Sequence, residues 1–205
     1  PGFAMDAVFL LLATACREIK SVRVTRVVDI TPRALELRHE VGIGLTPEGF
    51  AQVAGNGSGG IPGLRESLLM IAHTMGWRLD DIRETLEPII ARRRLRTDYF
   101  LVDKGYVQGL RHTVSAVAAG HEIIRLELEI SLEAENPRDE LVVEGKPPIR
   151  VSIPGGQQDD QATASIMVNC VPAVVRRGMS GLLSIRDMPL APYYSAGTSM
   201  TDSIA

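Results

Sequence analysis

The chain has 205 residues, of which 45% are hydrophobic and 23% are charged, a composition typical of a globular protein with its own core. Its formal net charge is -3, so it lacks the positive field that gathers phosphates, and we expect no nucleic-acid partner. The apolar run 8–13 is too short to span a bilayer, so we also expect no membrane attachment. Cys16 and Cys170 lie far apart in the sequence, which favours reduced thiols in a cytoplasmic protein.

The first half of the chain predicts helices around one strand. Residues 1–19 are apolar almost throughout and begin with proline, which predicts a buried helix. Alternation over residues 21–30 predicts a strand, and the pattern slips at Arg26–Val28, which indicates a bulge. Thr46 and Pro47 have the residue types of a helix cap and first turn. A new helix is therefore expected to start there.

A glycine-rich segment, residues 55–63, precedes the clearest amphipathic helix, residues 64–75, which should end at Gly76. The glycines lack the spacing of a dinucleotide-binding loop, and no strand-turn-helix unit surrounds them, so a flexible connection is indicated. Residues 81–91 fit either a helix or a strand by periodicity. Because Pro88 would disrupt a helix interior, we predict an edge strand.

The clearest β pattern is a long hairpin. Apolar and charged residues alternate over 124–132, after a strand at 114–118 and a turn at Ala119–Gly120, which predicts antiparallel strands with one wet face. Two short strands follow at 140–144 and 149–153. The expected fold class is thus α+β, with an open, mostly antiparallel sheet flanked by helices.

The last part of the chain predicts one more helix. Asp159 or Asp160 is expected to cap a helix from residue 161 to about Arg177, with a kink at Pro172. Residues 195–205 are small and polar, as in disordered ends. We therefore predict one domain, residues 1–190, and a flexible tail, residues 191–205.

Three residues are candidates for substrate binding. Arg111 and His112 make a polar break in an apolar stretch of the hairpin, which favours either a substrate-facing role or ordinary strand positions. Glu66 lies in a first helical turn, where the helix dipole alone favours an acid; the alternative is an ionic contact with substrate or with a partner domain. No catalytic nucleophile or acid–base pair stands out, and the histidines lack metal-ligand spacing, so we expect no metal.

The segment Gly155–Ala164 combines a glycine pair, two aspartates and the start of a helix. Helix N-termini bind anions readily, so this segment favours either a close approach to a ligand or no more than a capped helix.

Several stretches, in order along residues 1–190, resemble the C-terminal domain of the 2,4-diaminopentanoate dehydrogenase and amine dehydrogenase group, relatives of dihydrodipicolinate reductase. The matching stretches are Pro1–Asp6, Val41–Phe50, Gly63–Ser67, Gly76–Trp77, Glu84–Ala91, Asp159–Asn169 and Asp187–Pro189. The resemblance implies that residues 1–190 form an α+β domain like that of the reductases, a substrate-binding and dimerisation domain. It also implies an N-terminal Rossmann domain, absent from this chain, that holds NAD or NADP.

In such enzymes the cofactor transfers hydride to or from a C–N centre, and the protein orients the reactants. The resemblance implies that Pro1, Gly2 and Phe3 lie near the nicotinamide, that Thr163 and Asn169 face the domain junction, and that the substrate is an amine or is amino-acid-like. The chain opens on Pro1 directly before an apolar helix, so we expect a piece of a longer protein, inactive alone; initiator-methionine removal is the alternative.

One departure leaves a second hypothesis open. The family often has a histidine in the glycine-rich approach to the 64–75 helix, where this chain has Ile61. The chain also lacks the His-His and Lys signature of the lysine-pathway reductases. The alternative function is therefore a stand-alone, non-catalytic ligand-binding or assembly domain. A homodimer or higher homo-oligomer is expected under both hypotheses, because the hairpin offers a broad sheet.

Overall fold

The structure is a computed structural model, and it describes residues 2–33, 37–57, 59–177, 180–184 and 187. The chain divides into two compact units, Pro1–Gln157 and Gln158–Ala205. Pro1 and the predicted tail, residues 191–205, lie outside the described residues. The predictions for these two parts therefore stay predictions.

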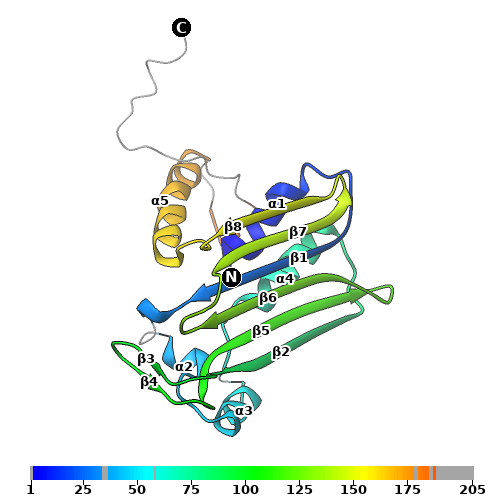
Figure 1. Ribbon diagram of the computed structural model, residues 1–205. Helices are drawn as coiled ribbons and strands as arrows, with labels where there is room; N and C mark the ends of the chain where they lie inside the picture. The colour runs from blue at the N-terminus through cyan, green and yellow to red at the C-terminus, as the bar shows by residue number, and fades with distance from the viewer. Residues whose placement is uncertain (1, 34–36, 58, 178–179, 185–186, 188–205) are drawn as a thin grey trace. The chain divides into compact units, whose positions relative to one another are not determined.

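The first unit is built on a six-stranded sheet, with the order β2-β5-β6-β1-β7-β8 (Figure 1). Its strands are β1 (Glu18–Asp29), β2 (Asp81–Ile90), β5 (Val107–Ala118), β6 (His121–Ser131), β7 (Arg138–Lys146) and β8 (Ile149–Pro154). Only the β1–β6 pair is parallel, and the other neighbours are antiparallel. The predicted α+β class with an open, mostly antiparallel sheet is confirmed.

Short helices surround this sheet, and α1 and α4 lie on one of its faces (Figure 1). The first unit contains the π-helix η1 (Phe3–Ala7), α1 (Val8–Ala13), the 3-10 turn η2 (Thr31–Arg33), α2 (Arg38–Val41), α3 (Pro47–Gly55) and α4 (Leu64–Met75). A two-stranded ribbon joins β3 (Leu95–Arg96) to β4 (Leu101–Val102). The second unit contains α5 (Asp159–Arg177), with Pro172 inside it. Among the described residues, no helix combines the length and apolar character of a membrane crossing.

The predicted long hairpin is confirmed as β5 and β6. Ala119 and Gly120 join the strands, and both have positive φ angles, 50° and 77°, as the tight turns that match strand twist require. Ile124, Leu126 and Leu128 are buried on the helix-covered face of the sheet. The residues between them are charged and point to the open face, so one face of the hairpin is wet.

Three other local predictions are confirmed: the start of α3, the end of α4 and the edge strand at Pro88. The Thr46 hydroxyl accepts a hydrogen bond from the Gly49 N–H at 3.1 Å and begins α3, and Gly76 ends α4 with φ 67°. The segment around Pro88 is the edge strand β2. Edge strands tolerate proline because the missing N–H breaks no ladder on the side facing solvent.

Two predictions in the first thirty residues were wrong. The first helix ends at Ala13 and strand β1 begins at Glu18, so the helix does not reach Ile19. The bulge expected at Arg26–Val28 is also absent, because the register between β1 and β6 is continuous there. The alternation breaks instead because Arg26 occupies an inward position: its side chain is 5% exposed and pairs with Asp139 on β7.

The predicted cap of the late helix was also wrong. The Gln158 carbonyl accepts a hydrogen bond from the Ala162 N–H at 2.9 Å, and α5 begins at Asp159. Both candidate aspartates therefore lie inside the first turn. Acids in that position still match the helix dipole, which explains why the sequence pattern suggested a helix start.

Candidate functional site

A buried histidine links three parts of the first unit. The His112 side chain on β5 is 5% exposed, and its Nε2 lies 2.8 Å from Oε1 of Glu84 on β2. The Oε2 atom of Glu84 lies 3.8 Å from the Arg65 guanidinium on α4. On its other side, the His112 ring meets the glycine-rich segment at Ile61. The sheet and the loop thus meet at one imidazole, and Glu84 lies between this ring and the helix start.

The hydrogen bonds indicate which tautomer the neutral ring adopts. The Ile61 N–H donates to His112 Nδ1 at 3.3 Å, so Nδ1 acts as an acceptor and carries no proton. The proton of the neutral ring must then be on Nε2, which donates to the Glu84 carboxylate. Because both ring nitrogens are already engaged, His112 has none left for a ligand.

The glycine-rich segment requires glycine at the position where it contacts Leu86 and His112. Gly60 has φ 97°, and a Cβ there would lie 3.0 Å from a Leu86 methyl carbon and 3.4 Å from the His112 ring. A side chain at this position would be strained and crowded. The segment predicted as a flexible connection is therefore packed against β2 and β5 at this point.

A second buried polar contact lies at the other side of α4. Asp6, in η1, accepts a hydrogen bond from the Ser67 hydroxyl at 2.7 Å and another from the Ala7 N–H. Burial raises the pKa of the Asp6 carboxyl above its ordinary value, and these hydrogen bonds only partly offset the effect. We did not predict a role for Asp6, although a single acid inside an apolar run was a signal that could have identified it.

We expect Asp6→Asn to stabilise the protein at neutral pH by about 1 kcal/mol, because an amide avoids the cost of burying a charge. The raised pKa means that the folded state holds a proton that the unfolded chain releases. The contribution of Asp6 to wild-type stability should therefore fall as pH rises from 3.8, the ordinary value, through the folded pKa. Urea unfolding of both proteins across this interval should show the stability of the wild type falling relative to that of Asp6→Asn.

Asp6→Ala is the control for this prediction. It removes the charge but leaves the Ser67 hydroxyl and the Ala7 N–H without their acceptor, so it should destabilise the protein at every pH. A difference in stability between the wild type and Asp6→Asn that does not change with pH in this interval would contradict the prediction.

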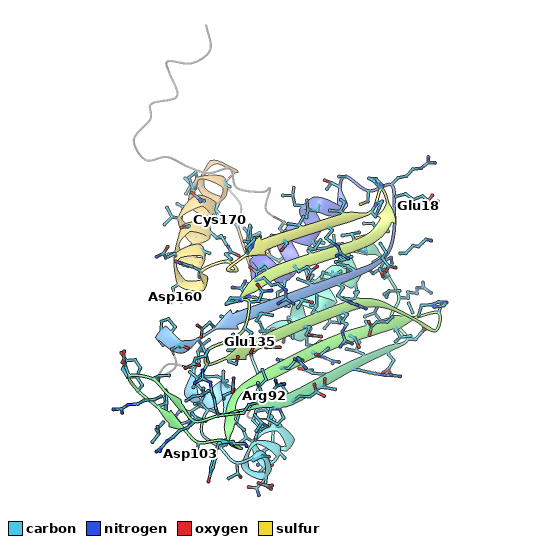
Figure 2. The ribbon with its side chains drawn as sticks, in the orientation of Figure 1. Glu18, Arg92, Asp103, Glu135, Asp160 and Cys170 are labelled. Atoms are coloured by element: carbon cyan, nitrogen blue, oxygen red, sulfur yellow. The ribbon has the colours of Figure 1, made fainter. Side chains whose placement is uncertain are left out.

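Arg111 lies on the opposite side of the sheet from His112, since neighbouring residues of a strand point to opposite faces. Its guanidinium lies 2.8 Å from Glu129 and 3.7 Å from Glu127 on β6, and the Glu129 hydrogen bond raises the pKa of Arg111 above its ordinary value. Arg111 lines an open-face hollow of about 660 Å³, together with Arg92 and Glu135, which lie at the same end of the sheet (Figure 2).

The other predicted site residues are dispersed. Glu66 is exposed on the first turn of α4, one residue after Arg65. Gly2 and Phe3 lie at the start of η1, where Phe3 is 38% exposed. Thr163 and Asn169 lie on α5, in the second unit. Of the three candidates for substrate binding, Glu66 and His112 lie on the helix side of the sheet, and Arg111 does not.

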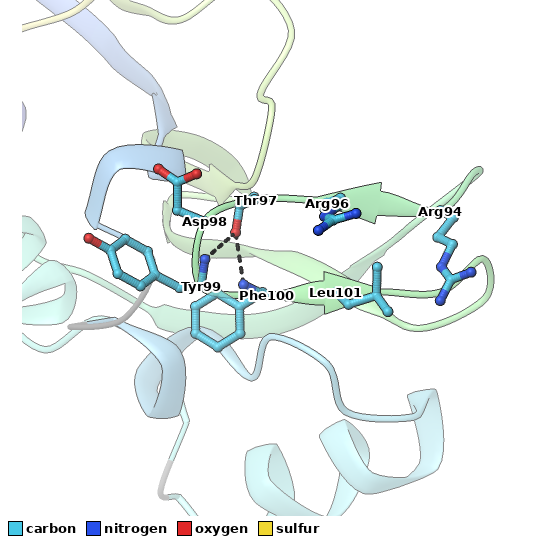
Figure 3. Close-up of a pocket in the computed structure, with 7 residues that line it drawn as sticks. All are labelled: Arg94, Arg96, Thr97, Asp98, Tyr99, Phe100 and Leu101. Carbon is cyan, nitrogen blue, oxygen red and sulfur yellow. Dashed lines mark hydrogen bonds between the residues drawn. The ribbon is translucent and has the colours of Figure 1, made fainter.

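A further hollow, of about 650 Å³, lies along the β3–β4 ribbon (Figure 3). The Thr97 hydroxyl accepts hydrogen bonds from the N–H groups of Tyr99 and Phe100, at 3.3 and 3.0 Å, and so shapes the turn. None of the predicted site residues that the structure describes lines this hollow. Within the described part of the chain, His, Cys, Asp and Glu side chains do not gather in groups of three that could hold a metal.

The fold is that of the corresponding part of a solved amine dehydrogenase. The chain matches the amine dehydrogenase from Mycobacterium smegmatis with a TM-score of 0.79 and 21% sequence identity, over 94% of this chain and 57% of that protein. This similarity defines the class of fold.

The sequence defines the family. The sequence profile described as the 2,4-diaminopentanoate dehydrogenase C-terminal domain matches residues 3–202, so the chain belongs to that family. The 2,4-diaminopentanoate dehydrogenase of Acetoanaerobium sticklandii is 28% identical over 200 residues, which are 93% of this chain and 55% of that enzyme. The chain therefore spans about half the length of this relative.

Proposed function

We propose that this chain is the substrate-binding and subunit-association part of an NAD- or NADP-dependent dehydrogenase that acts on the C–N bond of an amine or amino-acid-like substrate. The observation that carries the proposal is the family match over residues 3–202. The relative is a 2,4-diaminopentanoate dehydrogenase by name, and that compound is the first substrate to test. A nucleotide-binding domain is proposed for the part of the relative's length that this chain does not span.

We propose Gly2 and Phe3 as contacts of a flat cofactor ring. The Phe3 ring is 38% exposed, and a planar group can stack on such an apolar surface. When bound, the nicotinamide would supply the hydride transfer, while Asp6 and Ser67 hold the η1 main chain in place. Thr163 and Asn169 stay proposed contacts at the domain junction.

We test the proposal with the full-length protein. It should enhance or shift NADH or NADPH fluorescence, and it should reduce the oxidised cofactor when 2,4-diaminopentanoate is added. Failure of the full-length protein to bind either nucleotide would contradict the dehydrogenase proposal and leave the alternative, a non-catalytic binding or assembly domain.

We also propose that the open face of the sheet joins two copies of the chain. Thr113 and Ser115 are buried there, each with 8% of the surface exposed, and Arg111 is paired with carboxylates. Light scattering should give a dimer or higher oligomer, and Ser115→Arg should shift it toward the monomer, because a bulky charge would enter the middle of the face. Gln52→Arg, on the exposed side of α3, is the control. A strictly monomeric wild type would contradict this arrangement.

A further inference from the structure

We propose that Arg65 and Glu84 recognise the charged end of an amino-acid-like substrate: Arg65 binds its carboxylate, Glu84 binds its ammonium group, and His112 is a positioning residue that fixes Glu84. This inference rests on the dehydrogenase function proposed above and adds the residues that select the substrate class. All three residues belong to the first unit.

The first step is the attachment of Glu84 to the buried ring. Glu84 lies on β2 and its side chain is 38% exposed, whereas the His112 side chain is 5% exposed. An exposed glutamate normally samples many rotamers, and ordering such a side chain costs conformational entropy. Here the His112 Nε2–H holds Oε1 at 2.8 Å, with a charge-assisted bond of the stronger kind. One carboxylate oxygen is thereby fixed, and the other is directed toward Arg65.

The second step is the looseness of the pair between Arg65 and Glu84. The guanidinium nitrogen lies 3.8 Å from Oε2, and the two side chains are 47% and 38% exposed. That distance exceeds a hydrogen bond, and exposed ion pairs contribute only about 0–1 kcal/mol. Arg65 and Glu84 can therefore separate from each other and bind the charged groups of a ligand at little cost in free energy.

The third step is the match in chemistry. An amino acid carries a carboxylate and an ammonium group a few bonds apart, and Arg65 and Glu84 present the complementary charges side by side. A guanidinium binds a carboxylate in a bidentate manner, which adds specificity. A simple amine has no carboxylate for Arg65, so this pair distinguishes amino-acid-like substrates from plain amines.

The fourth step is the rigidity of the surroundings. The Ile61 N–H is bound to His112 Nδ1, and the Gly60 N–H donates to the Glu40 carbonyl on α2 at 3.2 Å. Both contacts hold the segment that leads into α4, on which Arg65 follows Gly60 by five residues. The imidazole thus positions Glu84 with one nitrogen and the approach to Arg65 with the other.

The test compares two substrates of the full-length protein: 2,4-diaminopentanoate and 1,3-diaminobutane, its analogue without the carboxylate. For Arg65→Gln we expect kcat/KM to fall about 10- to 100-fold with the first, the effect of losing a hydrogen bond between charged groups, and to stay unchanged with the second. Glu84→Gln, which keeps the oxygen that accepts the hydrogen bond from His112, should lower kcat/KM for both substrates. Arg83→Gln is the matched control, because Arg83 lies next to Glu84 on β2 and pairs with Asp81 on the open face.

Two amide substitutions of His112 and a 15N NMR spectrum test its role. Gln places its amide nitrogen near the position of Nε2 and Asn places its oxygen near Nδ1. We therefore expect the KM for 2,4-diaminopentanoate to change less in His112→Gln than in His112→Asn. The slow hydrogen exchange of the Ile61 amide should instead change less in His112→Asn than in His112→Gln. In the wild type, the 15N spectrum should show a neutral ring with Nδ1 far downfield of Nε2. A protonated ring, or the opposite tautomer, would overturn this assignment.

Direct binding separates this inference from the proposed function. If the full-length protein binds neither NADH nor NADPH, the dehydrogenase proposal fails, and calorimetry of the same two compounds with wild type and Arg65→Gln then decides the inference alone. Tight binding of 2,4-diaminopentanoate that Arg65→Gln abolishes would support it. No binding to the wild type, or an equal effect of Arg65→Gln on both compounds, would overturn it.

Discussion

We expect Asp139→Ala to lower the free energy of unfolding by about 3–5 kcal/mol, the cost of leaving a buried charge without its partner. The side chains of Arg26 and Asp139 are 5% and 7% exposed, and the guanidinium lies 3.4 Å from Asp139 Oδ2. Asp139 Oδ2 also accepts the Gln157 N–H at 2.8 Å, and Arg26 donates to the Gln157 carbonyl at 2.8 Å. The substitution therefore disrupts a network that joins β1, β7 and the segment after β8.

Two further variants distinguish the buried charge from the lost contact. Arg26→Met combined with Asp139→Leu removes both charges and should cost less than Asp139→Ala, because no unpaired ion stays in the interior. Glu18→Ala breaks the ion pair with Lys146, in which the Glu18 and Lys146 side chains are 51% and 68% exposed. This substitution should lower the free energy of unfolding by at most about 1 kcal/mol. The midpoints of urea unfolding measure the stability of all three variants. Equal losses for Glu18→Ala and Asp139→Ala would contradict the prediction.

The same buried pair shows why the sequence pattern could not predict every inward position of the sheet. The hairpin, the edge strand with Pro88 and the α3 start were predictable, because each depends on neighbours within a few residues. Arg26 was not, since its partner Asp139 is 113 residues away in the chain. A charged residue at an inward position could only be interpreted as a change of register. That interpretation produced the incorrect bulge.

The candidate site shows the same division between local and distant information. His112 was identifiable as a polar residue in an apolar stretch, but its function depends on Glu84 and Ile61, 28 and 51 residues away. Arg111 was grouped with it by adjacency in the sequence, whereas the pleat of β5 sends the two side chains to opposite faces. Glu84 begins one of the stretches that carry the family resemblance, but we predicted no role for it, because it is one of several charged residues on an edge strand.

The second large effect is expected at Gly109 on β5, three residues before His112. A Cβ at this position would lie 2.3 Å from the Ile130 carbonyl oxygen and 2.3 Å from the Ser131 Cβ, separations that neither strand can accommodate in place. Gly109→Ala must therefore push β5 and β6 apart. We expect a loss of about 3 kcal/mol or more in the free energy of unfolding, at the upper end of the cost of overpacking.

Gly55→Ala is the matched control for Gly109→Ala, because Gly55 ends α3 and an added Cβ there meets no atom within 4 Å. This substitution should be neutral or stabilise the protein by up to about 1 kcal/mol, since alanine has less backbone entropy to lose on folding. Because Gly109 pairs with Ser131 close to the His112–Leu128 pair, Gly109→Ala should also speed hydrogen exchange at Ile61, whose amide depends on the position of the His112 ring. Similar urea midpoints for the two alanine variants would show that β5 and β6 can separate here at no cost, and would contradict the close approach of these strands.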